Sequence, residues 1–329
     1  MTCKLERREF LGLAAATPLL LRDLSSPPSA AAWHNPPAQK FGIGHNLTTY
    51  ISGGRGPEGF WKGVEEIAKL GVRGTEADNT PSRLTETYEA SVGEVKDRLA
   101  KHDMRLVAIY QTLPVSDAAK FNDNLEQAIR VGRFLKNVGG EIFNLAGGAR
   151  PQPDPTEEFK TFGRFANELG KRLREEYGLQ LGYHPHTGTL VQTREEIGRM
   201  MDVTTPEHFA MCPDTGHLKA GGSDPLEVFK TYRSRIIYMH YKDWDPELVT
   251  PRTAETGRKG GFVELGKGVV DFRPLTEFLL DSGYDGWVMI ELDRALGPEI
   301  DAVRHNLDYM TKTLGLKLGQ PSGKESSAR

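Results

Sequence analysis

From residue 41 onward, short β-rich runs alternate with amphipathic stretches of helical period. The runs predict eight strands: Phe41–Gly44, Val72–Glu76, Arg105–Tyr110, Glu141–Leu145, Leu179–His184, Phe209–Cys212, Ile236–Tyr241 and Trp287–Leu292. The amphipathic stretches predict helices at Gly59–Leu70, Val92–Lys101, Asn122–Lys136, Glu157–Glu176, Arg194–Met201, Pro225–Tyr232, Phe272–Asp281 and Glu299–Leu314. Eight strand–helix units in one run predict an α/β fold, a single (β/α)₈ TIM barrel, with an open doubly wound sheet as the alternative.

The first 32 residues have the pattern of an export signal. Lys4, Arg7 and Arg8 precede the apolar stretch Phe10–Leu21, and the small residues of Ser29–Ala32 follow it. The sequence ERREFL around the arginine pair resembles the twin-arginine motif, which directs export of folded proteins. We therefore expect a periplasmic protein. The alternative is a cytoplasmic protein with a frayed basic helix at its start.

The remaining boundaries follow from composition. Residues 33–40 are expected to be a linker, and residues 41–315 one domain, because no linker-like composition interrupts them. The polar, Gly- and Ser-rich residues 316–329 predict a disordered tail. The loop 252–261 is expected to be a solvated connection, with a mobile lid as the alternative.

Composition and charge exclude several classes of protein. The chain is 38% hydrophobic and 26% charged, and its net charge of −3 becomes −4 without the four basic and three acidic residues of 1–32. A mildly acidic body argues against nucleic-acid binding, which needs a basic face. Cys3 and Cys212 cannot form a disulfide framework. No apolar run reaches the ~20 residues of a membrane span. We expect a small-molecule partner, no nucleic acid and no membrane after signal removal, with a homo-oligomer left open.

The carboxyl ends of the predicted strands carry many polar residues, and in such barrels function collects at those ends. The residues there are Glu76, Gln111, Asn144, His184, His186, Asp214, His217, His240, Lys242, Glu291 and Asp293, with His45 just past the first strand. Because alternate strand residues face opposite sides, His184, Asp214, His240 and Glu291 are expected to converge on the barrel axis from four successive strands.

Two imidazoles and two carboxylates form a mixed nitrogen and oxygen donor set. Such a set suits Mn²⁺, Co²⁺, Fe²⁺ or Zn²⁺ better than Ca²⁺ or Mg²⁺. The sequence therefore predicts one divalent metal ion on His184, Asp214, His240 and Glu291. The alternative is that the histidines are polar residues of a tight interior, with backbone groups as partners.

Three motifs connect these residues to a known family: YHPHTG at Tyr183–Gly188, PDTGHL at Pro213–Leu218 and HYKD at His240–Asp243. Over about residues 41–315 the chain resembles the xylose isomerase-like barrel superfamily of sugar isomerases, epimerases and dehydratases, and it is closest in motif to inosose dehydratase. The resemblance implies one metal on the four strand-end residues and a carbonyl or polyol substrate chelated to it. Epimerases of the superfamily carry Glu where this chain has His184.

These observations predict an enzyme, a metal-dependent sugar dehydratase or isomerase/epimerase that abstracts a proton next to the carbonyl of a keto-sugar or keto-polyol. Elimination is favoured, because His184 replaces one of the two bases of an epimerase. The alternatives are an epimerase of the same superfamily and a non-catalytic periplasmic sugar-binding protein. The catalytic candidates are Glu291, His186, Lys242 and His217. The substrate-binding candidates are His45, Glu76, Gln111, Asn144 and Trp244.

Overall fold

The computed structural model describes residues 37–52, 55–79, 92–150, 155–250 and 259–322. The chain divides into two units, residues 1–34 and 35–329, and everything described below belongs to the second. The expected signal peptide and the start of the expected linker lie outside the described residues, as do residues 252–258 of the predicted loop. Among the described residues, no helix combines the length and apolar character that a membrane crossing requires.

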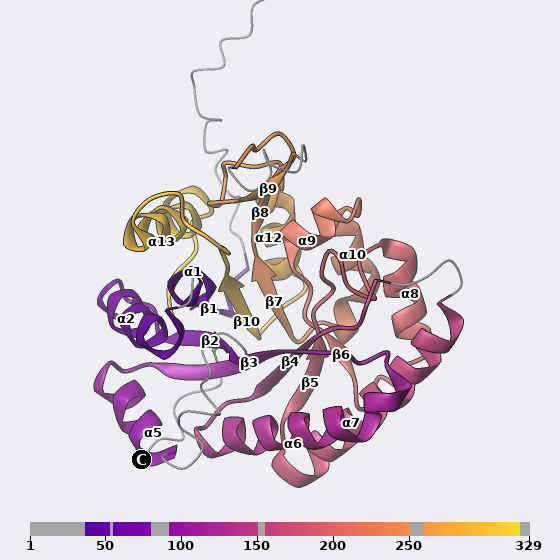
Figure 1. Ribbon diagram of the computed structural model, residues 1–329. Coiled ribbons are helices and arrows are strands. Elements are labelled where there is room, and N and C mark those ends of the chain that lie inside the picture. Colours follow the sequence, from indigo (N-terminus) through magenta and orange to yellow (C-terminus); the bar gives the residue numbers. More distant parts are fainter. Residues whose placement is uncertain (1–36, 53–54, 80–91, 151–154, 251–258, 323–329) are drawn as a thin grey trace, which may run out of the picture. The chain divides into compact units, whose positions relative to one another are not determined.

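Eight parallel strands form a nearly closed barrel (Figure 1). The strands are β1 Gly42–Asn46, β2 Gly74–Asp78, β3 Arg105–Leu113, β4 Ile142–Gly147, β5 Gln180–Tyr183, β6 Ala210–Met211, β7 Tyr238–Tyr241 and β10 Trp287–Ile290. The ladder runs β6-β5-β4-β3-β2-β1-β10-β7. Parallel bridges Met211↔Ile236 and Asp214↔His240 connect its two ends. The predicted barrel is confirmed.

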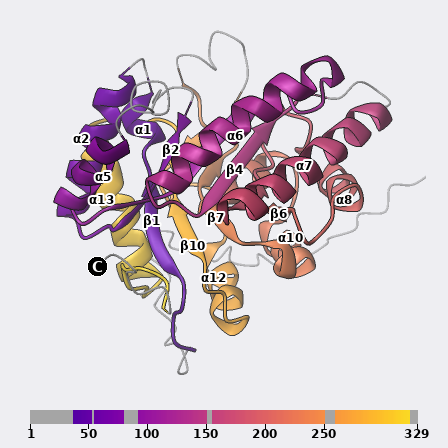
Figure 2. The ribbon, with the colours of Figure 1, turned by 90° about the horizontal axis from the view of Figure 1, so that it is seen from below.

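Helices cover the outside of this sheet (Figure 2). Their bounds are α2 Gly56–Lys69, α5 Val92–Lys101, α6 Phe121–Asn137, α7 Thr156–Tyr177, α8 Arg194–Asp202, α10 Pro225–Tyr232, α12 Phe272–Asp281 and α13 Glu299–Asp308. Shorter elements are α1 Thr48–Ile51, α9 Thr215–Ala220, the 3₁₀ turns η2 Ala118–Lys120 and η3 Arg233–Arg235, and the π turn η4 Tyr309–Thr313. The π turn continues α13, so the predicted last helix changes its hydrogen-bond pattern near Tyr309.

A hairpin that the sequence did not predict follows β7 directly. Its antiparallel strands are β8 Asp243–Asp245 and β9 Gly261–Val263. Three-residue strands are too short to show an alternating pattern, so the segment resembles a loop in the sequence. The buried carboxylate of Asp243 fixes the base of the hairpin. It accepts hydrogen bonds from the backbone N–H groups of Trp244, Gly266, Gly268 and Val270.

A cluster of buried residues on and beside the strands forms part of the core of the barrel. It consists of Val107, Ala108, Ile142, Cys212, Tyr238, Trp287 and Met289. Gly182 leaves room for the Cys212 side chain, because a Cβ on Gly182 would lie 2.1 Å from Cys212 Sγ. Cys212 is fully buried, as expected for a small core residue.

The segment 316–322, which composition placed in a disordered tail, is bonded to the start of the barrel. The Ile43 N–H donates to the Gly319 carbonyl at 3.0 Å, and the Ser322 N–H donates to the Lys40 carbonyl at 2.7 Å. These partners lie far away along the chain, so local composition does not reveal them. Residues 323–329 lie outside the described residues.

Candidate metal centre and active site

Four buried side chains converge at the carboxyl ends of four strands. His184 directly follows β5, Asp214 lies between β6 and α9, His240 belongs to β7, and Glu291 follows β10. One ligand atom from each of them lies within 4.8 Å of the corresponding atoms of the others. The structure thus brings together the four residues that strand parity selected.

Each of these residues has a buried polar atom without a hydrogen-bond partner. The atoms are His184 Nδ1, Asp214 Oδ2, His240 Nδ1 and Glu291 Oε2. His240 Nδ1 contacts Glu291 Oε2 and lies 3.7 Å from Asp214 Oδ2, but neither contact is aligned as a hydrogen bond. Buried polar atoms without partners are costly, and a cation between them would satisfy all four at once. The donor set therefore fits a divalent metal ion.

Asp214 is held in place by the helix that follows it. Its Oδ1 accepts a hydrogen bond from the His217 N–H at 2.7 Å and so caps the N-terminus of α9. The Thr215 hydroxyl donates to the Lys242 carbonyl at 2.6 Å, which joins this turn to the end of β7. The cap uses one carboxylate oxygen and leaves Oδ2 facing the cluster.

Glu76, on β2, lies behind His240. Its Oε2 is 2.6 Å from His240 Nε2 and accepts a hydrogen bond from Asn46, and its Oε1 accepts one from Asn144 at 2.7 Å. Two of the five predicted substrate-binding residues are thus buried beside the cluster: Glu76 contacts His240, and Asn144 holds Glu76. Asn46 was missed, although strand alternation places it on the interior face beside Glu76.

The structure places His45 inside β1, whereas the sequence analysis placed it just past the end of that strand. β1 continues to Asn46, and its register pairs His45 with Thr75 and Ile290, on the face opposite to Asn46. The ring is fully buried, its Nε2 has no hydrogen-bond partner, and burial lowers the pKa of His45 to about 4. His45 is thus part of the packing around the strand end.

Gln111 also lies inside its strand, β3, and not at the strand's end. β3 extends three residues beyond its predicted end, and Gln111 bonds to Asn79 at 2.7 Å and to the Thr112 carbonyl at 3.0 Å. Tyr110, on the other face, places its ring 5.3 Å from that of His184. Tyr110, and not Gln111, borders the cluster.

Lys242 lies beside the cluster with its side chain 1% exposed. Its Nζ is 2.5 Å from Asp293 Oδ1, 3.3 Å from His217 Nε2 and 3.4 Å from Glu291 Oε1. Burial opposes the charged form, but the carboxylates of Asp293, Glu291 and Asp214 outweigh it and raise the pKa of the Lys242 ammonium. Asp293, a strand-end residue without an assigned role in the sequence, is its shortest polar contact.

The other two catalytic candidates, His186 and His217, stack with ring centres 3.7 Å apart. His217 Nδ1 lies 3.0 Å from the Thr187 hydroxyl, and its Nε2 faces the Lys242 ammonium. Burial and Lys242 lower the pKa of both imidazoles. The lowered pKa of His217 and the raised pKa of Lys242 make the ammonium the proton-bearing member of this pair.

Burial and neighbouring charges shift the pKa values of three cluster residues, His240, Glu291 and Asp214. Burial alone would lower the pKa of His240, but the carboxylates of Glu76 and Glu291 outweigh it and raise that pKa well above its usual value. For Glu291 burial acts upward, while Lys242 and His240 lower its pKa well below the usual value. Burial raises the pKa of Asp214. Carboxylates that stabilise a cation at this point would equally favour a metal ion.

The hairpin borders the site on the side of Lys242. Trp244 packs against Phe262 with ring centres 5.3 Å apart, and Phe262 packs against His217 at 4.6 Å. The ring that contacts the catalytic candidates is therefore that of Phe262, and Trp244, one of the five predicted substrate-binding residues, packs behind it. No pattern in the sequence points to Phe262, because the residues before it show no strand or helix period.

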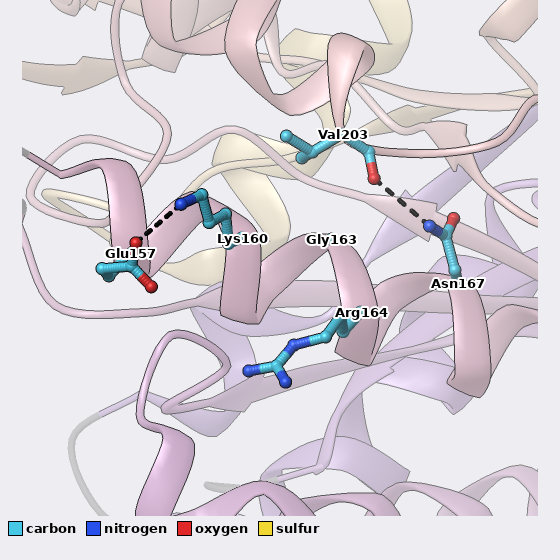
Figure 3. A pocket seen from close by; sticks show the side chains of 6 residues that line it. All are labelled: Glu157, Lys160, Gly163, Arg164, Asn167 and Val203. Carbon is cyan, nitrogen blue, oxygen red and sulfur yellow. Dashed lines mark hydrogen bonds and ion pairs between the residues drawn. The ribbon is translucent and has the colours of Figure 1, made fainter.

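A surface pocket lies along α7 (Figure 3). It is lined by Glu157, Lys160, Gly163, Arg164, Asn167 and Val203. Within it Lys160 pairs with Glu157 at 2.7 Å, and Asn167 donates to the Val203 carbonyl at 3.2 Å. None of these residues belongs to a strand end, so the pocket is separate from the candidate site.

Comparison with known proteins places the chain in a family. Residues 64–313 match the family described as xylose isomerase-like TIM barrel, and the chain belongs to this family. A relative named inosose dehydratase, from Lacticaseibacillus casei, is 40% identical over 254 residues, which cover 71% of this chain and 82% of the relative. The chain is therefore an enzyme, and the predicted family and its likeness to inosose dehydratase are confirmed.

Two solved structures share the fold. The probable 3-DHS dehydratase AsbF of Bacillus anthracis superposes with a TM-score of 0.67 at 17% identity, covering 82% of this chain and 99% of that one. IolI protein with a bound zinc atom superposes with a TM-score of 0.66 at 18% identity, covering 84% and 98%. Identities this low show the fold alone.

Proposed function

We propose that this protein is a divalent-metal-dependent dehydratase that removes water from a keto-sugar or keto-polyol of the inosose type. The observation that carries the proposal is the position of a buried Lys242 ammonium, 3.4 Å from Glu291 Oε1, beside four orphaned ligand atoms. Dehydration needs a base and an acid at neighbouring atoms of the substrate, and these two groups supply them. The 40% identity to an inosose dehydratase supports the same reaction class.

His184, Asp214, His240 and Glu291 would hold the ion, and their donor set favours Mn²⁺, Co²⁺, Fe²⁺ or Zn²⁺. When bound, such an ion polarises a carbonyl and an adjacent hydroxyl, which acidifies the C–H bond between them. Glu76 would orient His240 through its Nε2, as carboxylates commonly orient metal-binding histidines.

The residues of the chain would move the protons. The carboxylate of Glu291 takes the proton from the carbon next to the carbonyl, and the C–H electron pair becomes the new C=C bond. The C–O bond on the neighbouring carbon breaks, and Lys242 gives its proton to the departing hydroxyl, which leaves as water. Asp293 holds the Lys242 ammonium at 2.5 Å for this transfer. The products are water and an unsaturated ketone.

Incubation of the metal-loaded protein with a panel of inososes and 3-keto-glucosides tests this proposal. We expect the ultraviolet absorbance of an unsaturated ketone to appear, and EDTA treatment to abolish it. Lys242→Met should abolish it with the metal still bound, whereas Lys267→Met, at an exposed site, should not. Epimer formation without an unsaturated product would show an epimerase, and binding without turnover would show a sugar-binding protein. Either result would refute the proposal.

A further inference from the structure

The Lys242 ammonium is enclosed by two elements from different parts of the chain. Asp293, which follows β10, contacts it at 2.5 Å. On another side lies the ring of Phe262, on β9, whose centre is 4.2 Å from Nζ. This separation lies within the range at which a cation is attracted to the face of an aromatic ring.

The hairpin presents Phe262 at this point by several independent contacts. The register pairs Phe262 with Trp244, and the two rings pack at 5.3 Å. The carboxylate of Asp243 fixes the base of the hairpin to the loop at Gly266. A Cβ on Gly216 would lie 3.0 Å from Lys242 Cγ and 3.1 Å from Phe262 Cδ1, so a larger residue there would crowd both side chains.

We propose that Phe262 is a positioning residue for Lys242. The face of its ring attracts the ammonium, and its bulk keeps water from the contact between Lys242 and His217, whose ring lies 4.6 Å from that of Phe262. The ammonium is thereby held toward Asp293 and Glu291, in the place from which it would protonate a departing hydroxyl. The catalytic part of this inference rests on the proposed function, but the position of the ammonium can be measured without substrate.

The test compares Phe262→Tyr, Phe262→Leu and Phe262→Ala, with Val249→Ala as a matched control. Val249 is an exposed apolar residue of the segment that connects β8 to β9, and it has no part in the site. The first measurement is the rate at which an amine-reactive reagent modifies Lys242 in the native metal-loaded protein, quantified at that residue by mass spectrometry. The second is kcat and KM with the substrate that the panel identifies.

We expect Lys242 to be protected in the wild type, in Phe262→Tyr and in Val249→Ala, and to be modified in Phe262→Ala. Phe262→Leu keeps an apolar side chain of intermediate size but loses the aromatic face, so Lys242 should stay largely protected. Its kcat should fall roughly two- to thirtyfold, the loss of one cation–π contact, with little change in KM. Phe262→Tyr should restore kcat.

Two results would overturn the proposal. One is a Lys242 as protected in Phe262→Ala as in the wild type, and the other is a kcat in Phe262→Leu equal to that of the wild type. If Phe262→Ala does not fold, the comparison of leucine with tyrosine still decides the matter. Modification of Lys242 in Phe262→Ala, with no wild-type turnover of any ketone, would refute the proposed function but leave the position of Lys242 established.

Discussion

Replacing Asp214 with asparagine separates two roles that its carboxylate has in this structure. Oδ1 caps α9 by accepting the His217 N–H at 2.7 Å, while Oδ2 is buried without a hydrogen-bond partner beside His240. Asparagine keeps an oxygen for the cap and replaces the free oxygen with an amide nitrogen, which is not a metal ligand. Alanine removes both.

The size of the expected effect follows from mass action. A metal that binds only the folded protein stabilises it by about 2.7 kcal/mol at one hundred times its Kd and by about 4 kcal/mol at one thousand times. For a domain of this size, such a gain raises Tm by about 5–15 °C. Asp214→Asn should lose this metal-dependent rise. Asp214→Ala should lose it too, and it should also lose about 1 kcal/mol of stability from the missing cap.

The assay is thermal unfolding followed by circular dichroism, on protein stripped with EDTA and then reloaded with Mn²⁺ or Zn²⁺, with the metal content measured in parallel. Asp224→Asn is the matched control, because Asp224 caps α10 through the Glu227 N–H and lies outside the site. It should keep the full metal-dependent rise. A wild-type rise in Asp214→Asn would refute Asp214 as a metal ligand and, with it, the reasoning from orphaned atoms.

Two further predictions concern residues around the cluster. Glu76→Gln should weaken metal affinity about 10- to 100-fold, because Glu76 contacts His240 Nε2 at 2.6 Å; competition with a chelator measures this, and an unchanged affinity would contradict the support role. The variant His45→Leu tests the pH dependence of stability. Burial lowers the pKa of His45 to about 4 in the folded protein, so between pH 6.5 and 4 the unfolded chain binds a proton that the folded chain does not. The free energy of unfolding therefore falls as the pH drops through this range. That loss amounts to about 3 kcal/mol, and denaturant unfolding of His45→Leu should show a pH dependence shallower by this amount; a parallel dependence would show that His45 does not titrate this way.

The bounds of a helix could be predicted where a capping residue and the pattern of apolar positions indicated the same start. α10 and α12 have the predicted bounds, because Asp224 and Asp271 cap amphipathic stretches at their first turns. The strand ends were less certain, since β1 and β3 continue past their predicted ends. His45 and Gln111, which the sequence analysis placed at strand ends, therefore lie inside strands, on the faces opposite to Asn46 and Tyr110.

Contacts between distant segments could not be predicted in the same way. Glu76 was found as a strand-end carboxylate, but its contact with His240 depends on a barrel that brings β2 opposite β7. Phe262 follows residues with no periodic pattern, so neither its strand nor its neighbours could be inferred. The same holds for the bond between Ile43 and Gly319, which joins the first strand to the C-terminal segment.

The strand period explains why the candidate metal donors and the candidate proton-transfer groups lie next to each other. Residues two apart on an extended strand face the same side, about 7 Å further along the strand. Three of the four strands that supply a cluster residue therefore supply a second polar residue two positions further along the chain. The pairs are His184 with His186, His240 with Lys242, and Glu291 with Asp293. The lower residues converge with Asp214 on the orphaned atoms, while the upper ones meet around Lys242 Nζ and the ring of His217. A substrate that entered from the strand ends would meet the proton-transfer layer with its outer atoms and the metal layer with its carbonyl. In this arrangement the carbonyl lies near the metal donors and the departing hydroxyl lies near Lys242. Elimination requires such a separation, because the hydroxyl is protonated at a carbon other than the one that the carbonyl activates.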